Sequence, residues 1–175
     1  KEIEFLCKIA KPDYGYISNF GKAHLEGFGG FKGEKKKKSE MYNFLQENNK
    51  MAFVNLDDAI QNEKTTQLKR FTFSTSNKNT DVRIGHIEAN PMVKINYNNL
   101  SIHSHLIGIY NANNINAAIT IGNYFKVTDN LIKEAIENYI PENNRSQLIQ
   151  KNGNEIVLDA YNANPSSMTA AIMNF

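Results

Sequence analysis

The sequence has few of the features that mark secreted, membrane-spanning or nucleic-acid-binding proteins. Its 175 residues contain one cysteine, Cys7, which excludes an internal disulfide framework and is typical of a reducing cytosol. No apolar run approaches the length that spans a bilayer, and no signal peptide is visible. The formal net charge is only +2, whereas dedicated nucleic-acid binders usually carry a strong basic excess. We therefore expect a cytoplasmic protein with no membrane segment and no nucleic-acid partner.

The chain does contain enough apolar residues to form a core. Hydrophobic residues make up 41% of the sequence, and the length suits one domain or one domain and a piece of a second. The chain starts at Lys1 without a methionine and ends at Phe175 within a helical pattern. We therefore expect a fragment of a longer protein.

Helical and strand patterns alternate along the chain. The short apolar segment 51–55 is typical of a buried strand, and 71–74 predicts another. The remaining predictions are strands at 14–18 and 155–158 and helices at 2–9, 35–46, 113–125 and 129–139. A further helix should begin at Asn164-Pro165. This alternation predicts an α/β fold.

The segment 81–106 instead has the alternation of a β-hairpin, with a turn at Asn98-Asn99. His103 and His105 fall on the opposite face from the apolar residues of this segment, so both should be exposed. The sequence therefore predicts a small antiparallel insert in the α/β fold.

A glycine-rich segment, 27–35, invites comparison with a phosphate-binding loop. A Walker A loop has the pattern G-x-x-x-x-G-K-[ST]. The residue five places after Gly29 is Glu34, and the one five places after Gly30 is Lys35. Neither is the required glycine, so the chain lacks a complete triphosphate cradle.

The lysine run 35–38 has two interpretations. Such runs usually form a solvated basic face. Helical spacing, however, puts Lys37 and Lys38 on the extension of an apolar stripe that starts at Met41. An inward lysine with cationic neighbours has a lowered pKa, and a neutral amine can react with carbon dioxide. The resulting carbamate would offer two oxygens to Mg²⁺.

Four other polar residues are candidate ligand contacts, each with a plainer alternative. His24 lies in a loop after a strand, where α/β folds bind ligands, although a loop histidine is usually only solvated. Asn111 and Asn114 share one face at a helix start, where they could cap the helix or pair with an adenine edge. Asp159 follows a strand and could accept from ribose hydroxyls, or its segment could simply form a turn.

Three stretches, in this order, resemble the Mur ligase family. They are Ile17-Ser-Asn-Phe-Gly-Lys-Ala-His-Leu-Glu-Gly-Phe-Gly with Lys38-Ser-Glu, then Gly108-Ile-Tyr-Asn-Ala-Asn-Asn-Ile-Asn-Ala-Ala, then Asn144-Arg-Ser with Leu158-Asp-Ala-Tyr-Asn-Ala-Asn-Pro-Ser-Ser-Met. Within the family, the Ala-His-Leu-Glu and Tyr-Asn-Ala-Asn-Pro segments resemble the members that add D-alanyl-D-alanine to a UDP-linked muramoyl tripeptide.

The resemblance implies a P-loop-NTPase-like central ligase domain over residues 1–140, incomplete, with a mainly parallel sheet flanked by helices. Residues 141–175 would begin a Rossmann-like C-terminal domain with one strand and one helix. The family's phosphate loop and a metal-binding glutamate would precede Lys1. We therefore expect this piece alone to be inactive, and we expect a monomer.

The resemblance also assigns roles to matching residues. His24 and a carbamylated Lys38 would hold Mg²⁺. Asn111 and Asn114 would contact the adenine of ATP, and Asp159 would lie near the ribose. Arg145 matches an arginine that reaches the nucleotide phosphates from the C-terminal side. Asn19 lies in the loop that lines the cleft.

The implied reaction has two steps. The tripeptide carboxylate attacks the γ-phosphate of ATP to form an acyl phosphate and ADP, and the amine of D-alanyl-D-alanine then displaces phosphate. Cations are needed because two anions approach one another in the first step. The alternatives are a sister ligase that adds a different amino acid, a non-catalytic nucleotide- or nucleic-acid-binding module, and a purely structural domain.

Overall fold

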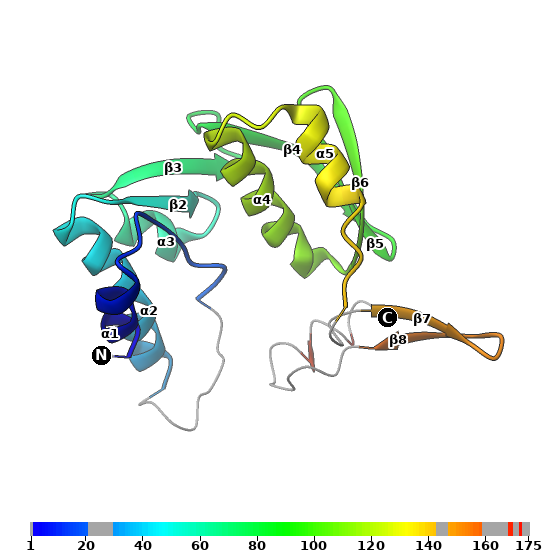
Figure 1. Ribbon diagram of the computed structural model, residues 1–175, viewed down its shortest axis with the longest axis horizontal. Helices are drawn as coiled ribbons and strands as arrows, with labels where there is room; N and C mark the ends of the chain where they lie inside the picture. Colours follow the sequence, from blue (N-terminus) through cyan, green and yellow to red (C-terminus); the bar gives the residue numbers. More distant parts are fainter. Residues whose placement is uncertain (1, 21–29, 143–146, 159–167, 170–171, 173–175) are drawn as a thin grey trace.

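The computed structural model describes residues 2–20, 30–142, 147–158, 168–169 and 172. Its main feature is a six-stranded sheet whose strands follow one another in chain order, β1 to β6 (Figure 1). A separate two-stranded sheet, β7–β8, follows it along the chain. The α/β prediction is therefore confirmed.

The sheet is parallel in its first half and antiparallel in its second. The strands are β1 (Tyr14–Tyr16), β2 (Met51–Asn55), β3 (Lys69–Ser74), β4 (Val82–Ala89), β5 (Met92–Tyr97) and β6 (Leu100–Ile107). Strands β1 to β4 pair in parallel, whereas β4, β5 and β6 form an antiparallel meander. The predicted antiparallel insert thus continues the same sheet, and its turn lies at Asn98-Asn99 as predicted.

Three helices lie along one face of the parallel strands: α1 (Glu2–Ala10), α2 (Gly30–Glu47) and α3 (Ala59–Lys64). Their apolar residues form one core with the sheet, which includes Leu45 of α2 and Val54 of β2. Helix α1 ends where Lys11 takes a positive φ of 46° and donates its N–H to the Cys7 carbonyl, an αL helix ending. Pro12 then prevents continuation.

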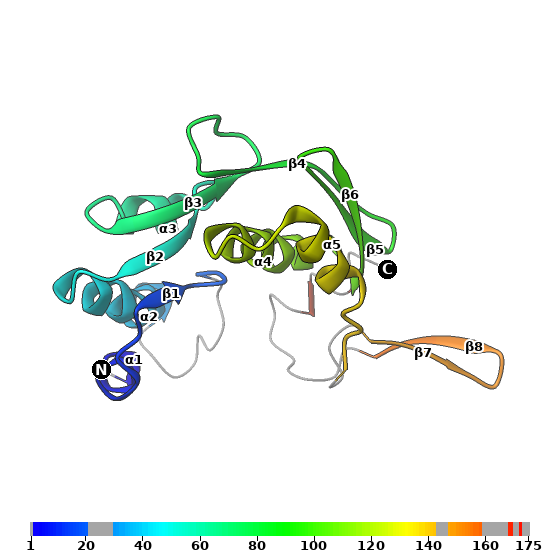
Figure 2. The ribbon, with the colours of Figure 1, turned by 45° about the horizontal axis from the view of Figure 1, so that its top comes forward.

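The opposite face of the parallel strands is covered by α4 (Ala112–Tyr124), and α5 (Asp129–Glu137) packs against α4 and β6 (Figure 2). Their core joins Ile115 and Ile119 of α4 to Phe73, Ile84 and Ile95 of the strands. Helix α4 runs antiparallel to β1–β3. Its last residue, Tyr124, lies with its ring centroid 5.4 Å from those of Tyr14, the first residue of β1, and Phe53, in the middle of β2. The first turn of α4 therefore faces the carboxyl ends of these strands.

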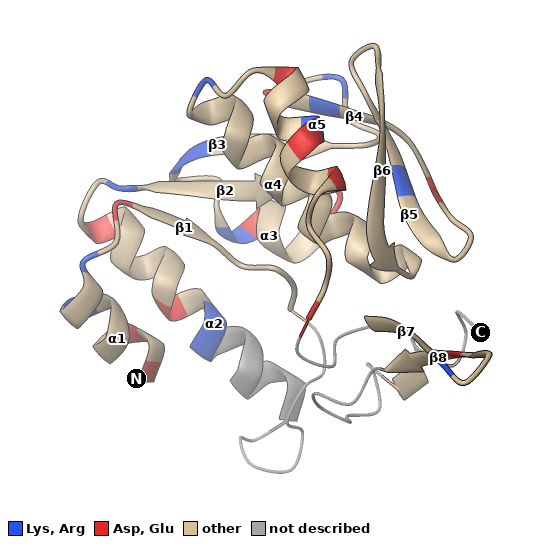
Figure 3. Cartoon of the chain, turned by 45° about the vertical axis from the view of Figure 1, so that its right-hand side comes forward, with Lys and Arg blue, Asp and Glu red and all other residues tan. Residues whose placement is uncertain are grey.

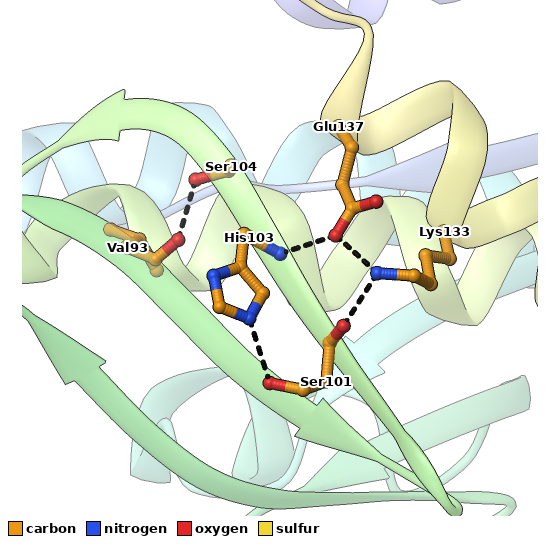
Figure 4. A network of polar contacts seen from close by, with 6 residues as sticks. All are labelled: Val93, Ser101, His103, Ser104, Lys133 and Glu137. Atoms are coloured by element: carbon orange, nitrogen blue, oxygen red, sulfur yellow. Dashed lines mark hydrogen bonds and ion pairs between the residues drawn. The ribbon is translucent and has the colours of Figure 1, made fainter.

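The side chains of α5 occupy the outer edge of β6 (Figure 4). Lys133 donates to the Ser101 carbonyl at 2.7 Å and also to the Glu137 carboxylate, which accepts the His103 N–H at 2.8 Å. The His103 ring contacts the Ser101 hydroxyl at 3.2 Å. These bonds satisfy backbone groups that an edge strand would otherwise offer to other chains. His103 and His105 are exposed, as predicted.

Several element boundaries differ from the sequence predictions. Helix α2 begins at Gly30 rather than residue 35, and α3 was not predicted. Strand β8 (Asn154–Leu158) matches the prediction, but it pairs antiparallel with an unpredicted strand, β7 (Gln147–Lys151), through a turn at Asn152-Gly153. Asn152 and Gly153 both have positive φ, which such a two-residue hairpin turn requires. The Rossmann-like domain beyond β8 remains a prediction.

Candidate functional site

The carboxyl ends of β1, β2 and β3 meet at one edge of the sheet, which is where ligands bind in parallel α/β folds. The first turn of α4 reaches the same edge, because the Tyr16 hydroxyl at the end of β1 donates to the Asn113 carbonyl at 3.5 Å. Burial, and secondarily the Asp58 carboxylate, raises the pKa of Tyr16 to about 12. The phenol therefore stays protonated and remains a donor at neutral pH.

Asp57 fastens the segment after β2 to the segment after β3. Its carboxylate accepts hydrogen bonds from the hydroxyls of Ser74, Thr75 and Ser76 and from the Thr75 N–H, at 2.5–2.8 Å. Burial alone would raise the pKa of Asp57, but these hydrogen bonds outweigh it and hold the pKa below its ordinary value. Asp57 is thus an ionised clamp between two strand ends.

Asp58 has a different role, as the N-cap of α3. One carboxylate oxygen accepts the N–H groups of Ile60 and Gln61, and the other accepts the Gln61 side-chain amide. Gln61 is buried and accepts the N–H of Asn55 in return. This network sets the end of β2 and explains why so short a helix forms there.

Lys38 lies in α2 next to the chain that leaves β1. Its Nζ donates to the Asn19 carbonyl at 3.0 Å. Lys38 and Lys37 are both half-buried, in keeping with the predicted extension of the apolar stripe. The structure therefore brings the predicted catalytic lysine to the carboxyl end of β1, three residues beyond Tyr16.

Asn111 and Asn114 are joined at the start of α4. The Asn114 amide nitrogen donates to the Asn111 side-chain oxygen at 3.1 Å, and the Asn111 amide donates to the Ile107 carbonyl at 2.7 Å. Asn111 occupies the N-cap position of α4 but makes no side-chain capping bond, so the capping alternative is wrong. Asn114 is exposed, and the chain Ile107–Asn111–Asn114 fixes how it presents its carboxamide.

Three predicted site residues, His24, Arg145 and Asp159, lie outside the described residues. Their convergence with Lys38 therefore remains a prediction. Within the described part of the chain, no group of three or more histidine, cysteine or acidic side chains could hold a metal ion. The carboxylates nearest the edge, Asp57 and Asp58, are already occupied by Ser, Thr and backbone donors. A Mg²⁺ ion at this edge would need the ligands expected at positions 24 and 38.

We predicted no role for Asp57 and Asp58, which lie shortly after the predicted strand 51–55. The sequence nevertheless contained a signal, because the hydroxyl-bearing segment Ser74-Thr-Ser begins at the last residue of a strand. If two strands are parallel neighbours, their carboxyl ends lie side by side, so a carboxylate after one strand can accept hydrogen bonds from hydroxyls after the other. The sequence did not predict the order of the strands, and therefore did not predict that β2 and β3 are parallel neighbours. Figure 3 shows the charged residues of the described elements, with acidic and basic segments interspersed.

The family profile described as "Mur ligase middle domain" matches residues 1–122. The chain therefore belongs to the Mur ligase family, whose members are ATP-dependent ligases that form amide bonds. No helix in the described residues is long and apolar enough to cross a membrane.

Among individual relatives, the chain is similar to UDP-N-acetylmuramoyl-tripeptide–D-alanyl-D-alanine ligases. It is 29% identical over 172 residues to that of Bacillus subtilis, covering 98% of this chain and 38% of the relative. It is 29% identical over 180 residues to that of Escherichia coli, covering 98% of this chain and 40% of the relative. The chain thus spans about two-fifths of the length of these curated relatives.

Solved structures agree with this relationship. MurF from Acinetobacter baumannii has a TM-score of 0.83 at 28% identity, over 98% of this chain and 39% of the other. MurF ligase from Thermotoga maritima in complex with ADP has a TM-score of 0.81 over 99% of this chain and 41% of the other. At 23% identity the latter supports the fold alone.

Proposed function

We propose that this chain is part of a ligase that adds D-alanyl-D-alanine to UDP-N-acetylmuramoyl-tripeptide, with ATP as the energy source. One observation carries the proposal: the residues predicted from two separate motifs lie at one edge of the sheet. Lys38 contacts that edge through Asn19, and the Asn111–Asn114 pair contacts it through Tyr16 and the first turn of α4. Residues 1–140 would belong to the central ATP-binding domain and 141–175 to the start of the C-terminal domain.

The proposed reaction joins a carboxylate to an amine. A tripeptide carboxylate oxygen attacks the γ-phosphorus of ATP, the bond to the β,γ-bridging oxygen breaks, and ADP leaves. The D-alanyl-D-alanine nitrogen then attacks the acyl carbon, the bond to the phosphate oxygen breaks, and the amine proton passes to solvent or a base. Mg²⁺, when bound, would offset the charge of the phosphates.

The described residues suit the nucleotide side of this reaction. The Asn114 carboxamide offers a donor and an acceptor, the pair that an adenine edge requires, and Asn111 holds it in place. Lys38 would join carbon dioxide through its nitrogen, release a proton and become an anion able to hold Mg²⁺ together with His24. Arg145 would contact the phosphates and Asp159 the ribose.

The test uses the longest natural polypeptide that contains this chain. Phosphate release is measured with ATP, Mg²⁺, UDP-N-acetylmuramoyl-tripeptide and D-alanyl-D-alanine. The Lys38→Ala variant should lose roughly a hundredfold or more of kcat, because a group that positions charge in the transition state is removed. In the unsubstituted protein, ¹³C-labelled bicarbonate should give a carbamate NMR signal that Lys38→Ala lacks.

Lys37→Ala is the matched control, since Lys37 is half-buried on the same helix one residue away, and it should keep kcat within about twofold. Activity with a different amine, such as a diamino acid or glutamate, and none with D-alanyl-D-alanine would point to a sister ligase. Nucleotide binding without phosphate release would point to a non-catalytic module. Either result would contradict the proposal.

A further inference from the structure

Two hairpin turns of the structure begin with the same residue type in the same backbone conformation. Asn98 starts the two-residue turn between β5 and β6, and Asn152 starts the one between β7 and β8. Their φ angles are 51° and 52°, and both residues are exposed. The following residue differs, because Asn98 precedes Asn99 whereas Asn152 precedes Gly153. The two turns therefore allow a comparison of how each asparagine side chain can react with the backbone that follows it.

The backbone nitrogen after Asn152 is accessible. No other asparagine in the sequence precedes a glycine. A Cβ added at Gly153 would meet nothing within 4 Å, so the space around this residue is open. Within the described residues, the Gly153 N–H makes no backbone hydrogen bond. The Asn152 carboxamide can therefore approach this nitrogen without displacing another group.

The two carboxamides also differ in how they are held. That of Asn98 donates to the Asp129 carboxylate at 2.7 Å. That of Asn152 makes no hydrogen bond to any residue that the structure describes, although the Asn152 backbone carbonyl accepts from the Asn154 amide at 3.3 Å. Asp129 thus fixes the side chain of Asn98, whereas the side chain of Asn152 can rotate toward the next residue.

The strands on either side of Asn152 give the turn little support. Strands β7 and β8 form a two-stranded sheet of their own, whereas β5 and β6 belong to the six-stranded sheet. Two-stranded hairpins are marginally stable by themselves, and glycine adds further backbone freedom. The turn at Asn152 should therefore open more often than the turn at Asn98, and its backbone can then leave the left-handed conformation.

We propose that Asn152-Gly153 is a site of spontaneous covalent modification, at which the asparagine becomes aspartate or isoaspartate through a cyclic imide. The Gly153 backbone nitrogen loses its proton and attacks Cγ of Asn152. The bond between Cγ and Nδ2 breaks, and ammonia leaves with a proton taken from water. Water then opens the imide at one of its two carbonyls, so that water is the only co-reactant. This inference does not depend on the proposed function.

The two products have different consequences for the hairpin. Opening at the backbone carbonyl of residue 152 gives isoaspartate, which routes the main chain through Cβ and Cγ and lengthens the turn by one methylene. A two-residue turn matches the strand twist only in specific conformations, so the lengthened turn should lose the pairing of Lys151 with Asn154. Opening at Cγ gives ordinary aspartate, and Asp-Gly suits the same turn.

Incubation of the longest natural polypeptide that contains this chain, at pH 6, 7 and 8, tests the proposal. Peptide mass spectrometry follows the replacement of the amide NH₂ by OH at each asparagine. A carboxyl methyltransferase that acts on isoaspartate, supplied with a labelled methyl donor, measures the isoaspartate product. Residue 152 should convert at least roughly tenfold faster than residue 98, because glycine and an unheld carboxamide favour ring closure. The rate should rise about tenfold per pH unit, since the attacking nitrogen must lose a proton.

Two variants separate the effect of the glycine from that of the side-chain contact. Gly153→Asn reproduces the Asn-Asn pair of the other turn and should slow the conversion of Asn152 by roughly tenfold. Asn99→Gly places a glycine after Asn98, yet residue 98 should still convert more slowly than residue 152, because Asp129 holds its carboxamide.

Hydrogen exchange measures the consequence for the hairpin. The isoaspartate form, separated by ion-exchange chromatography, should exchange the amides of residues 148–150 roughly tenfold or more faster than the Asn152→Asp variant. That variant is the matched control, because it carries the charge of the product without the added methylene. Protected amides in the isoaspartate form would contradict the proposed loss of pairing.

A synthetic peptide of residues 147–158 shows that the incubation conditions permit the reaction. If this peptide converts while residue 152 of the folded protein stays unmodified, the proposal is wrong. Equal rates at residues 98 and 152 would also overturn it, because the reaction would then be indifferent to the glycine and to the Asp129 contact.

Discussion

The Ser74 hydroxyl donates to the Asp57 carboxylate at 2.5 Å, and this contact joins the carboxyl ends of β2 and β3. Together with the bonds from Thr75 and Ser76, it fixes two of the segments that border the candidate nucleotide site. The same carboxylate is therefore unavailable to a metal ion. Asp57 contributes to the site by holding two of its segments in place. Its contribution can therefore be measured as a change in the free energy of unfolding.

Replacement of Asp57 by asparagine should lower the free energy of unfolding at pH 7 by about 1 kcal/mol, since the carboxylate is exposed to solvent and its hydrogen bonds are partly screened. The hydrogen bonds hold the pKa of Asp57 below its ordinary value. Its ionised form therefore stabilises the fold above the unfolded-state pKa of about 3.9, and the contribution is lost as the pH falls through the lower folded-state pKa.

Urea unfolding from pH 7 down to pH 3 checks this expectation, because the difference between Asp57→Asn and the unsubstituted chain should shrink toward the acid end. Asp13→Asn is the control. Asp13 makes one exposed ion pair with Lys50, which is worth about 0.5 kcal/mol or less. A difference for Asp57→Asn that stays constant across this pH range would contradict the assigned role.

The Asn111–Asn114 bond predicts coupled effects on nucleotide binding. Asn114→Ala should weaken ADP binding by about tenfold through loss of a hydrogen-bonded pair. Asn111→Ala should weaken it as well, because Asn114 loses its support. The double variant should fall short of the sum of the single effects, as expected for residues in one network.

Calorimetric titration of ADP into the longest natural polypeptide containing the chain measures these effects. Asn113→Ala is the matched control, since Asn113 is exposed on the same turn and meets Tyr16 only through its backbone carbonyl. Strictly additive losses would show that the two asparagines act independently.

Local patterns in the sequence sufficed for most elements. The alternation over residues 93–106 correctly predicted the turn at Asn98-Asn99 and the exposure of His103 and His105. The six-residue helix α3 was missed because its formation depends on the Asp58 cap and on buried Gln61 rather than on an apolar stripe. Periodicity does not detect a helix of this kind.

Candidate site residues could be predicted from the sequence only where the interaction partner is near in sequence or where the residue belongs to a specific motif. Lys38 was selected by its motif, and its amine contacts the Asn19 carbonyl beyond the end of β1, while its role remains a prediction. The Asn111 side chain bonds the carbonyl of Ile107 instead of capping α4, because the bend between β6 and α4 brings that carbonyl within reach. Such a bend is set by tertiary packing, and the letters alone do not specify it.

Gly85 and Gly15 allow a test of how closely β4 approaches β5 and β1 approaches α2. A Cβ on Gly85 would lie 2.7 Å from the Asn96 backbone oxygen, whereas one on Gly15 would meet the flexible ends of Leu45 and Met41. Gly85→Ala should therefore destabilise the fold by about 2–3 kcal/mol and Gly15→Ala by about 1 kcal/mol, because backbone yields less than side-chain ends. Thermal unfolding of both variants gives the comparison, and the reverse order would show that β4 and β5 separate readily.

Asn116 offers a substitution that should stabilise the protein. Its side chain is 1% exposed between α4 and the sheet, and its amide oxygen accepts no hydrogen bond from any residue that the structure describes. A buried acceptor without a partner carries its full desolvation cost, and an apolar side chain of similar shape avoids that cost. Asn116→Leu should raise the free energy of unfolding by about 1 kcal/mol and the Tm by about 2–4 °C.

Asn113→Leu, on the exposed side of the same helix, is the control and should change the free energy of unfolding by less than about 0.5 kcal/mol. Destabilisation by Asn116→Leu would mean that the amide is satisfied in solution, for instance by a buried water between α4 and the strands.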